Sequence, residues 1–161
     1  MYPDVCKWLC QILESRFRDS KIEVHNLSES YLSKFISAYK IGNLPPEWIT
    51  WDIKVDIVGF ILRSDKPTLL TFVERKNSQL TLAHLSQTLG YSRIALPFLS
   101  FLLSPLGLSS SLSSLLQEYK RTDILEYHWK KGELPHKMLV AEWDASSYNI
   151  DRNSIIGRSN L

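Results

Sequence analysis

The most informative part of the sequence holds an aspartate, a glutamate and a lysine at the spacing of two paired strands. Asp56 lies in the apolar run VDIVGF, and after seventeen intervening residues Glu74 and Lys76 follow the run TFV. Because every second side chain of a strand points to the same face, Glu74 and Lys76 would point into one space, about 7 Å apart. If the two runs pair as a hairpin, Asp56 reaches the same space. We therefore expect two carboxylates and an ammonium to meet at the end of an apolar sheet.

Such a cluster can perform metal-dependent chemistry on phosphate esters. Carboxylates bind hard cations such as Mg²⁺ or Mn²⁺, which polarise a phosphoryl oxygen and lower the pKa of a bound water. Lys76 can orient that water or neutralise the charge of the transition state. A Glu-x-Lys triplet alone is common and usually marks a solvated strand end. Asp56 strengthens the case, because an unpaired carboxylate is costly to bury among apolar residues.

The elements that must position these groups follow an α/β order. Apolar periodicity predicts helices over 4–18, 28–39, 81–94 and 106–121, and strands over 21–27, 49–62, 68–74, 95–103, 122–128 and 137–143. Two apolar stripes on the 81–94 helix predict that it is buried on both sides. We expect one domain over 1–161, built on a mixed sheet flanked by helices. Its polar tail over 144–161 is predicted to be partly loose.

Composition narrows the class of protein. The 161 residues are 44% hydrophobic and 22% charged, which is typical of a folded globular protein and excludes disorder as the main state. A net charge of +2 means that nucleic acid could be bound only through a local basic patch. The apolar stretch 94–108 contains two prolines and a glycine and is shorter than the ~20 residues of a membrane helix. With no recognisable signal peptide and two cysteines, we expect no membrane partner and a reducing, cytoplasmic location.

The spacing of Asp56 from the triplet Glu74-Arg75-Lys76, together with the helix that follows, resembles the PD-(D/E)xK nuclease superfamily. This superfamily includes restriction endonucleases and Holliday-junction resolvases, and its αβββαβ core matches the order of elements from residue 4 to about 104. The resemblance implies a restriction-endonuclease-like fold and a metal-dependent nuclease acting on DNA. It implies that Asp56, Glu74 and the backbone carbonyl of Arg75 hold Mg²⁺ or Mn²⁺, and that Lys76 positions or activates water.

The resemblance extends to two helices. Many members carry a Gln, often followed by a Tyr, on the helix after the Glu-x-Lys strand, and Gln87 and Tyr91 match them. Gln87 would then support Lys76 or a phosphate, although a buried glutamine can equally satisfy a backbone group. Many members also place an acid on the first helix, where Glu14 is the match and a candidate metal ligand.

Two of these assignments have rivals in the sequence. Asp52 lies four residues before Asp56 and so on the same face of a regular strand, but only Asp56 has the apolar surroundings typical of the family. Glu23 is the rival of Glu14. Glu14 also has a structural role available, since Arg18 at i+4 can form a helical ion pair with it.

Three positions depart from the family pattern. Val55 stands where a proline is usual, and Arg75 stands where the middle residue of the triplet is usually apolar. The triplet ERK resembles the structure-specific flap endonucleases of excision repair, but Leu80 occupies the place of that branch's further aspartate. The branch of the superfamily therefore stays open.

Two alternative functions are consistent with these residues. A metal-dependent DNA nuclease is the first hypothesis, and the alternative is a non-catalytic DNA-binding or assembly module that retains the nuclease fold. The intact Asp56, Glu74 and Lys76 favour the enzyme. Cutting both strands of a duplex in one encounter needs two active sites, so we expect a homodimer whose two-fold symmetry matches that of the duplex.

Overall fold

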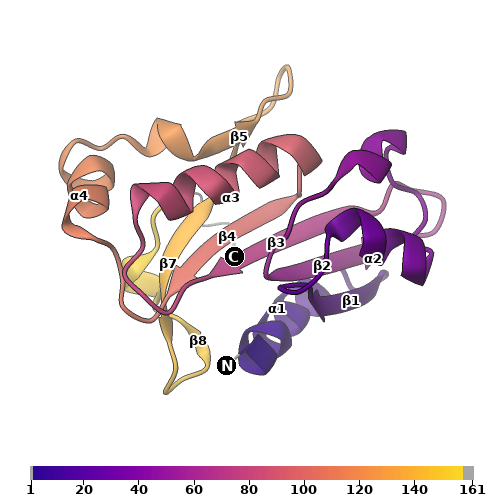
Figure 1. Ribbon diagram of the computed structural model, residues 1–161, viewed down its shortest axis with the longest axis horizontal. Coiled ribbons are helices and arrows are strands. Elements are labelled where there is room, and N and C mark those ends of the chain that lie inside the picture. Colours follow the sequence, from indigo (N-terminus) through magenta and orange to yellow (C-terminus); the bar gives the residue numbers. More distant parts are fainter. Residues whose placement is uncertain (1, 158–161) are drawn as a thin grey trace.

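A mixed sheet of six strands, in the order β1-β2-β3-β4-β7-β8, runs through the computed structural model, which describes residues 2–157 (Figure 1). β1, β2 and β3 pair antiparallel, β4 and β7 continue the sheet in parallel, and β8 returns antiparallel to β7. The strands are β1 (Lys21–Asn26), β2 (Ile57–Leu62), β3 (Leu69–Arg75), β4 (Leu99–Ser104), β7 (Leu139–Asp144) and β8 (Asn149–Ile150). The expected mixed sheet is confirmed.

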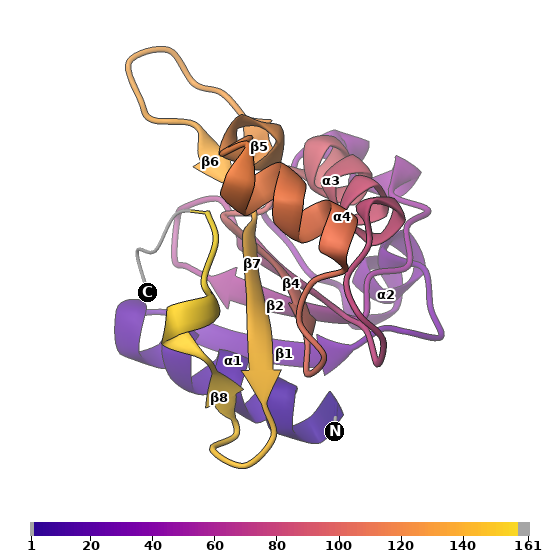
Figure 2. The same cartoon turned by 90° about the vertical axis from the view of Figure 1, so that its left-hand side faces the viewer.

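Helices cover both faces of this sheet. They are α1 (Tyr2–Arg16), α2 (Leu32–Tyr39), α3 (Leu82–Ala95) and the short α4 (Ser110–Ser113). α1 lies against one face, while α3 and α4 lie over the other (Figure 2). The order α1-β1-β2-β3-α3-β4 is the expected αβββαβ core, with α2 inserted between β1 and β2.

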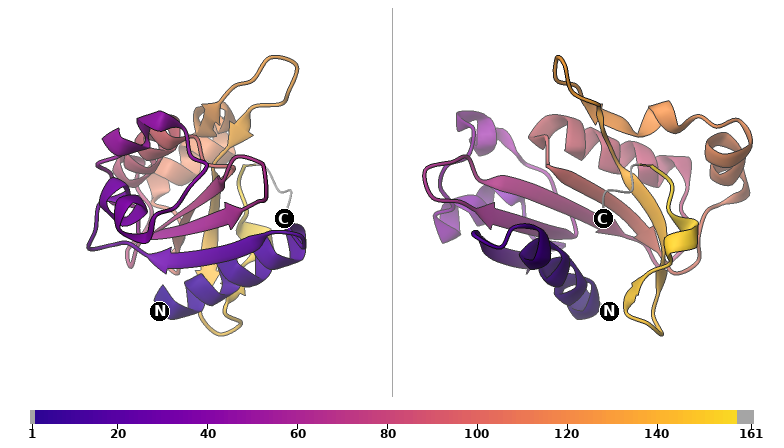
Figure 3. Two further views of the ribbon diagram at one scale, coloured as in Figure 1. Left: turned by 90° about the vertical axis from the view of Figure 1, so that its right-hand side faces the viewer. Right: turned by 180° about the vertical axis from the view of Figure 1, so that it is seen from behind.

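A separate two-stranded ribbon, β5 (Glu126–His128) with β6 (His136–Lys137), lies beside α3. Its connecting loop projects from the body of the molecule in both views of Figure 3. Among residues 2–157, no helix has the length and apolar character needed to cross a membrane.

α1 is held on the sheet by one apolar stripe. Val5, Leu9 and Leu13 are spaced four residues apart, so they share one side of the helix, and all three are fully buried. The opposing strand position is Gly59 of β2, where an added Cβ would lie 2.8 Å from Cδ1 of Leu13. The missing side chain therefore lets α1 approach the sheet closely. Trp8 fills the space beside the stripe.

The predicted strand over 49–62 is wrong in its first half. Pro46–Thr50 forms a 3-10 turn, the chain is then extended without joining the sheet, and β2 begins only at Ile57. The carbonyl groups of Trp51 and Ile53 accept hydrogen bonds from the first turn of α2, with N···O distances of 3.0 and 2.9 Å. The alternation of apolar residues is thus strand-like, but the hydrogen-bond partner is a helix.

The prediction that α3 is buried on both sides is also wrong. Leu85 and Leu89 are buried, but Leu82 and Ile94 are each 53% exposed. Leu82 of the first predicted stripe and Ile94 of the second thus lie at the surface, whereas Tyr91 of the second packs against the apolar cluster beneath α2.

Other predicted boundaries shift as well. The helix over 28–39 begins at Leu32, the strand over 95–103 begins at Leu99, and the helix over 106–121 is reduced to α4 followed by a π turn. The segment 122–128 is half 3-10 turn and half β5.

The tail is more regular than expected over its described part. Asn149–Ile150 pairs with β7, and Ile156 forms a β-bridge with Val140. Both contacts bury apolar side chains against the sheet, which offsets the polar composition of the segment. Residues 158–161 of the predicted tail lie outside the described residues.

The close approach of α1 to β2 generates a stability prediction. Gly59→Val places a Cβ and two methyl groups into the space held by Leu13, and overpacking of this kind costs about 1–3 kcal/mol. Urea unfolding should show this loss. In the Leu13→Ala background the same glycine change should cost less, because the added methyl groups then fill the cavity. Equal costs in the two backgrounds would contradict the proposed contact.

Candidate active site

The structure brings Asp56, Glu74 and Lys76 together at one end of the sheet. Asp56 occupies the bend immediately before β2, Glu74 is the penultimate residue of β3, and Lys76 follows that strand. Because β2 and β3 are antiparallel, the start of one lies beside the end of the other. Glu74 Oε1 accepts a hydrogen bond from Lys76 Nζ at 2.6 Å, and Glu74 Oε2 accepts one from the backbone N–H of Asp56 at 3.3 Å.

Backbone hydrogen bonds fix the bend that carries Asp56. Its side-chain Oδ2 accepts from the N–H of Arg75 at 2.8 Å, and its carbonyl oxygen accepts from the N–H of Leu27 at 2.8 Å. The Asp56 carboxylate is therefore held against β3, and its main chain is tied to the end of β1. The position depends on three separate segments of the chain.

Arg75, the charged residue in the middle of the triplet, is buried on the other face of the sheet. It lies between Glu74 and Lys76, so its side chain points to the opposite face of the sheet, where it is buried. Its guanidinium carbon lies 5.8 Å from the centre of the Tyr2 ring at the start of α1. The unusual charge in the middle of the triplet is thus placed against an aromatic face, a favourable arrangement for a cation.

Burial and charge act in opposite directions on Glu74. Its side chain is only 3% exposed. Burial, and next the negative charge of Asp56, raise the pKa of the Glu74 carboxyl, while the hydrogen bond from Lys76 lowers it; the raising effects are larger. An ion pair alone would lower this pKa, so the rise shows that desolvation and the neighbouring aspartate outweigh Lys76.

Lys76 remains a cation in this environment. Burial alone would lower the pKa of its ammonium, but the hydrogen bond to Glu74 and the charges of Glu74 and Asp56 raise the pKa overall. Its side chain keeps 23% of its surface exposed. In this cluster the Glu74 carboxylate is therefore buried, while the Lys76 ammonium is partly accessible to solvent.

Tyr2 is a member of the cluster that the sequence analysis missed. Its hydroxyl group is hydrogen-bonded to Asp56, and burial, followed by the charge of Asp56, raises the pKa of the phenol. Tyr2 precedes Val5 and Leu9 by three and seven residues, so it belongs to the sheet-facing side of α1. That periodicity was the available signal.

Glu14 does not join the site. It lies in the last turn of α1, is exposed and is hydrogen-bonded to Cys10. It lies twelve positions after Tyr2, which is about 18 Å along a helix. The expected helix acid is thus wrong for a physical reason: the start of α1, not its end, lies beside Asp56.

The two rival acids have other partners. Glu23 of β1 forms an ion pair with Lys21 at 2.9 Å. Asp52 accepts a hydrogen bond from the hydroxyl of Ser33 at 2.8 Å and so holds the start of α2. Of the two aspartates, Asp56 is the one in contact with Glu74.

α3 meets the cluster through a residue other than the expected one. Gln87 is exposed and donates a hydrogen bond to the Tyr91 hydroxyl at 3.0 Å. His84, one turn earlier, has its pKa lowered by burial and by the positive charge of Lys76. Its Nδ1 accepts the N–H of Thr81 at 3.2 Å in a capping box, so its neutral ring carries the proton on Nε2.

The donor set suits a hard cation that keeps part of its water. Asp56 and Glu74 supply carboxylate oxygens, and among residues 2–157 no group of three or more His, Cys, Asp or Glu side chains is placed to share a metal. Mg²⁺ usually binds through one or two carboxylates together with substrate phosphates and waters. Two acids therefore fit Mg²⁺ or Mn²⁺, and they do not form the four-ligand cage of a structural zinc.

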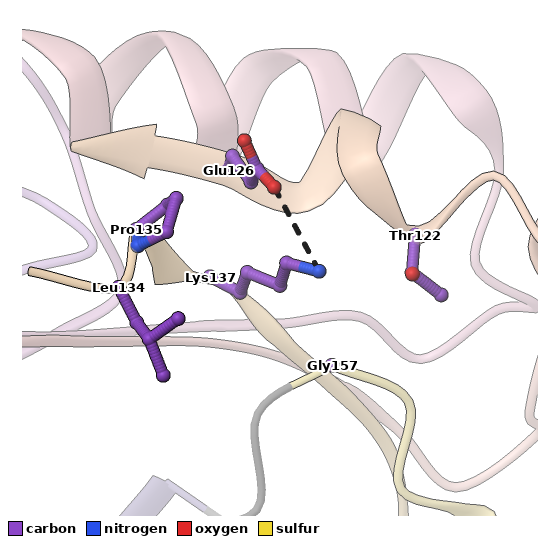
Figure 4. A pocket seen from close by; sticks show the side chains of 6 residues that line it. All are labelled: Thr122, Glu126, Leu134, Pro135, Lys137 and Gly157. Carbon is purple, nitrogen blue, oxygen red and sulfur yellow. Dashed lines mark ion pairs between the residues drawn. The ribbon is translucent and has the colours of Figure 1, made fainter. Parts of the chain in front are cut away.

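A cavity of about 370 Å³ lies elsewhere, on the β5–β6 ribbon (Figure 4). It is lined by Thr122, Glu126, Leu134, Pro135, Lys137 and Gly157. Glu126 and Lys137, which pair across β5 and β6, form an ion pair of 3.8 Å in its lining. None of these six residues belongs to the acidic cluster, so the cavity and the candidate active site are separate features.

The opposing influences on Glu74 can be measured. Asp56→Asn should lower the pKa of Glu74, because it removes the neighbouring negative charge, and Lys76→Met should raise it, because it removes the hydrogen bond and the positive charge. NMR titration of the carboxyl carbon reports both shifts, with exposed Glu47 as the internal control. Shifts of the same sign in both variants would contradict the described contacts.

The same pKa has a consequence for stability. The pKa of Glu74 is higher in the folded protein than in the unfolded chain, so the folded state binds this proton more tightly. The stability that Glu74 contributes at low pH is therefore lost as the pH rises through its folded pKa. The parent should therefore lose stability across that range, and Asp56→Asn should lose less.

Comparisons with known proteins give one structural likeness. No protein-family model matches the sequence, and no curated protein matches it at a significant level. The fold is similar to that of the MspJI restriction endonuclease solved in complex with a 27-mer oligonucleotide, with a TM-score of 0.43 and 9% sequence identity. The match covers 88% of this chain and 25% of the endonuclease, so this chain spans about a quarter of that protein's length. At this level of similarity, function must be inferred from the side chains of this chain.

Proposed function

We propose that this protein hydrolyses phosphodiester bonds in DNA with a Mg²⁺ or Mn²⁺ ion held by Asp56 and Glu74. The observation that supports this most strongly is the contact between a nearly inaccessible Glu74, Asp56 and Lys76 at one end of the sheet. A buried carboxylate is costly, and a second negative charge beside it adds to the cost. A divalent cation would offset both charges at once.

Each side chain has a distinct role in this proposal. The ion would polarise a phosphoryl oxygen and make a bound water acidic. Hydrogen bonds with the N–H of Arg75 and the hydroxyl of Tyr2 would orient the Asp56 carboxylate as a metal ligand. Lys76, charged and partly exposed, orients the attacking water or neutralises the phosphorane-like transition state. The backbone carbonyl of Arg75 is a further proposed ligand, and Glu14 has no part.

A second candidate is a DNA-binding or assembly module without catalysis. It is favoured by the ion pair that Lys76 already forms with Glu74, since this pair partly neutralises the carboxylate without any metal. The two proposals differ in whether Asp56 and Glu74 bind a divalent ion. In either case we propose that the protein acts as a homodimer on duplex DNA.

The metal site can be tested without any nuclease assay. Isothermal titration calorimetry should detect Mn²⁺ binding to the parent and none to Glu74→Gln, which keeps the size of the side chain and removes its charge. Glu47→Gln, an exposed acid, is the matched control and should bind as the parent does. Equal binding by Glu74→Gln and the parent would refute Glu74 as a ligand.

Lys76 separates the enzyme from the module. Lys76→Ala should lower the rate of Mg²⁺-dependent DNA cleavage by about 10²-fold or more, the scale of losing one positioned charge in a desolvated site. Lys76→Arg should not restore the rate, because a guanidinium holds its donors farther out. DNA affinity in Ca²⁺ should change little.

The control for this change is Lys66→Ala, which removes an exposed lysine from the β2–β3 turn. It should cleave at the parental rate. If Lys76→Ala also cleaves at that rate, Lys76 is only a solvated strand end and the catalytic proposal fails.

A further inference from the structure

Two lysines converge on one tyrosine at the start of α2. The ammonium nitrogen of Lys34 lies 5.4 Å from the centre of the Tyr31 ring, and that of Lys54 lies 5.0 Å from it. Tyr31 is 37% exposed and both lysines are exposed. The three residues, here called the Tyr31 patch, come from two different segments, since Lys34 belongs to α2 and Lys54 to the extended chain before β2.

The two lysines of the Tyr31 patch carry positive charge at the surface. Within residues 2–157, neither Lys34 nor Lys54 forms an ion pair, whereas Lys21, Lys76 and Lys137 each do. The carboxylate of Asp52, two residues before Lys54, accepts a hydrogen bond from the Ser33 hydroxyl and, within the described residues, is in no ion pair with either lysine. The two ammonium groups can be no farther apart than the sum of their distances to the ring, which is about one Debye length at 0.1 M salt. The ring attracts both, and so places two cations within reach of one anionic strand.

The Tyr31 patch lies next to the candidate active site along the chain. Ile53 and Val55 are buried, while Lys54 and Asp56 between and after them point to the other side. Lys54 is thus separated from Asp56 by the single residue Val55, at the point where the chain bends into β2.

A second connection runs through the main chain. The N–H of Leu27 donates to the carbonyl of Asp56, and the N–H of Leu32 donates to that of Ile53. These bonds tie the segment on either side of Tyr31 to the segment that carries Lys54 and Asp56. Figure 1 shows this chain passing beside α2 on its way into β2.

We propose that the Tyr31 patch binds the sugar–phosphate backbone of the DNA strand that enters the Asp56–Glu74 site. Lys34 and Lys54 contact phosphates beside the one that is cut, and Tyr31 keeps the two ammonium groups in place. Such contacts carry no base sequence, so they set affinity and register only. The choice of DNA as the polyanion rests on the proposed nuclease function, whereas the binding surface itself rests on the geometry of the three residues.

The test measures DNA binding apart from cleavage. The probe is a fluorescein-labelled 20-base-pair duplex, its anisotropy followed in Ca²⁺ at several salt concentrations. The double variant Lys34→Gln/Lys54→Gln should bind about tenfold or more weakly near 0.1 M salt. Its slope of log affinity against log salt should be shallower by about 1.8, since each phosphate contact contributes about 0.9.

The matched control is Lys7→Gln/Lys66→Gln, which also removes two exposed positive charges, from α1 and from the β2–β3 turn. It should keep nearly the parental slope. All four lysines are exposed, so both double variants should keep the parental melting temperature.

The outcomes separate the two proposals. Weaker binding by the patch variant alone, in a parent that cuts no DNA, supports the patch and overturns the nuclease. A parent that cuts DNA, with equal binding by both double variants, overturns the patch and leaves the nuclease standing. A parent that binds no duplex in Ca²⁺ overturns the patch.

Discussion

The antiparallel pairing of β2 with β3 is the constraint on which the rest of the site depends. Ile57 pairs with Val73, so Asp56, the residue before β2, lies opposite Glu74, the penultimate residue of β3. That register alone brings two carboxylates into one place, and the bond from the N–H of Arg75 to Asp56 fixes it. Slipping the register by one residue would point Glu74 and Lys76 to the α1 face and Arg75 to the site.

Placing two carboxylates together costs free energy, and the positive side chains near them lie on both faces of β3. Glu74 and Lys76 point one way and neutralise each other in part, while Arg75 points the other way and lies against Tyr2. Positive groups on both sides of the strand thus surround the paired acids. The result is a site in which the pKa of Glu74 is raised, which favours its neutral form, while the pKa of Lys76 is also raised, which keeps it charged.

Alternation and apolar context placed Glu74 and Lys76 on one face at the end of a strand. Asp56 was singled out by the family resemblance of its surroundings, and it lies in the bend before β2, outside the strand. Helix periodicity was not enough for Glu14 or Tyr2. It reports which side of a helix meets the sheet, but not which end lies near a given strand terminus. The strand predicted before β2 was wrong for a related reason. Alternating burial, here of Trp51 and Ile53, is the same whether the backbone pairs with a strand or with the first turn of α2.

The insertion of α2 between β1 and β2 gives the molecule a mechanical linkage. Main-chain hydrogen bonds run from the start of α2 to the segment that ends in Asp56. A shift of α2 along its axis would pull on that segment and tilt the carboxylate of Asp56 relative to Glu74. Pressure on this helix from outside would therefore be transmitted to the acidic pair as a change in the spacing of its oxygens.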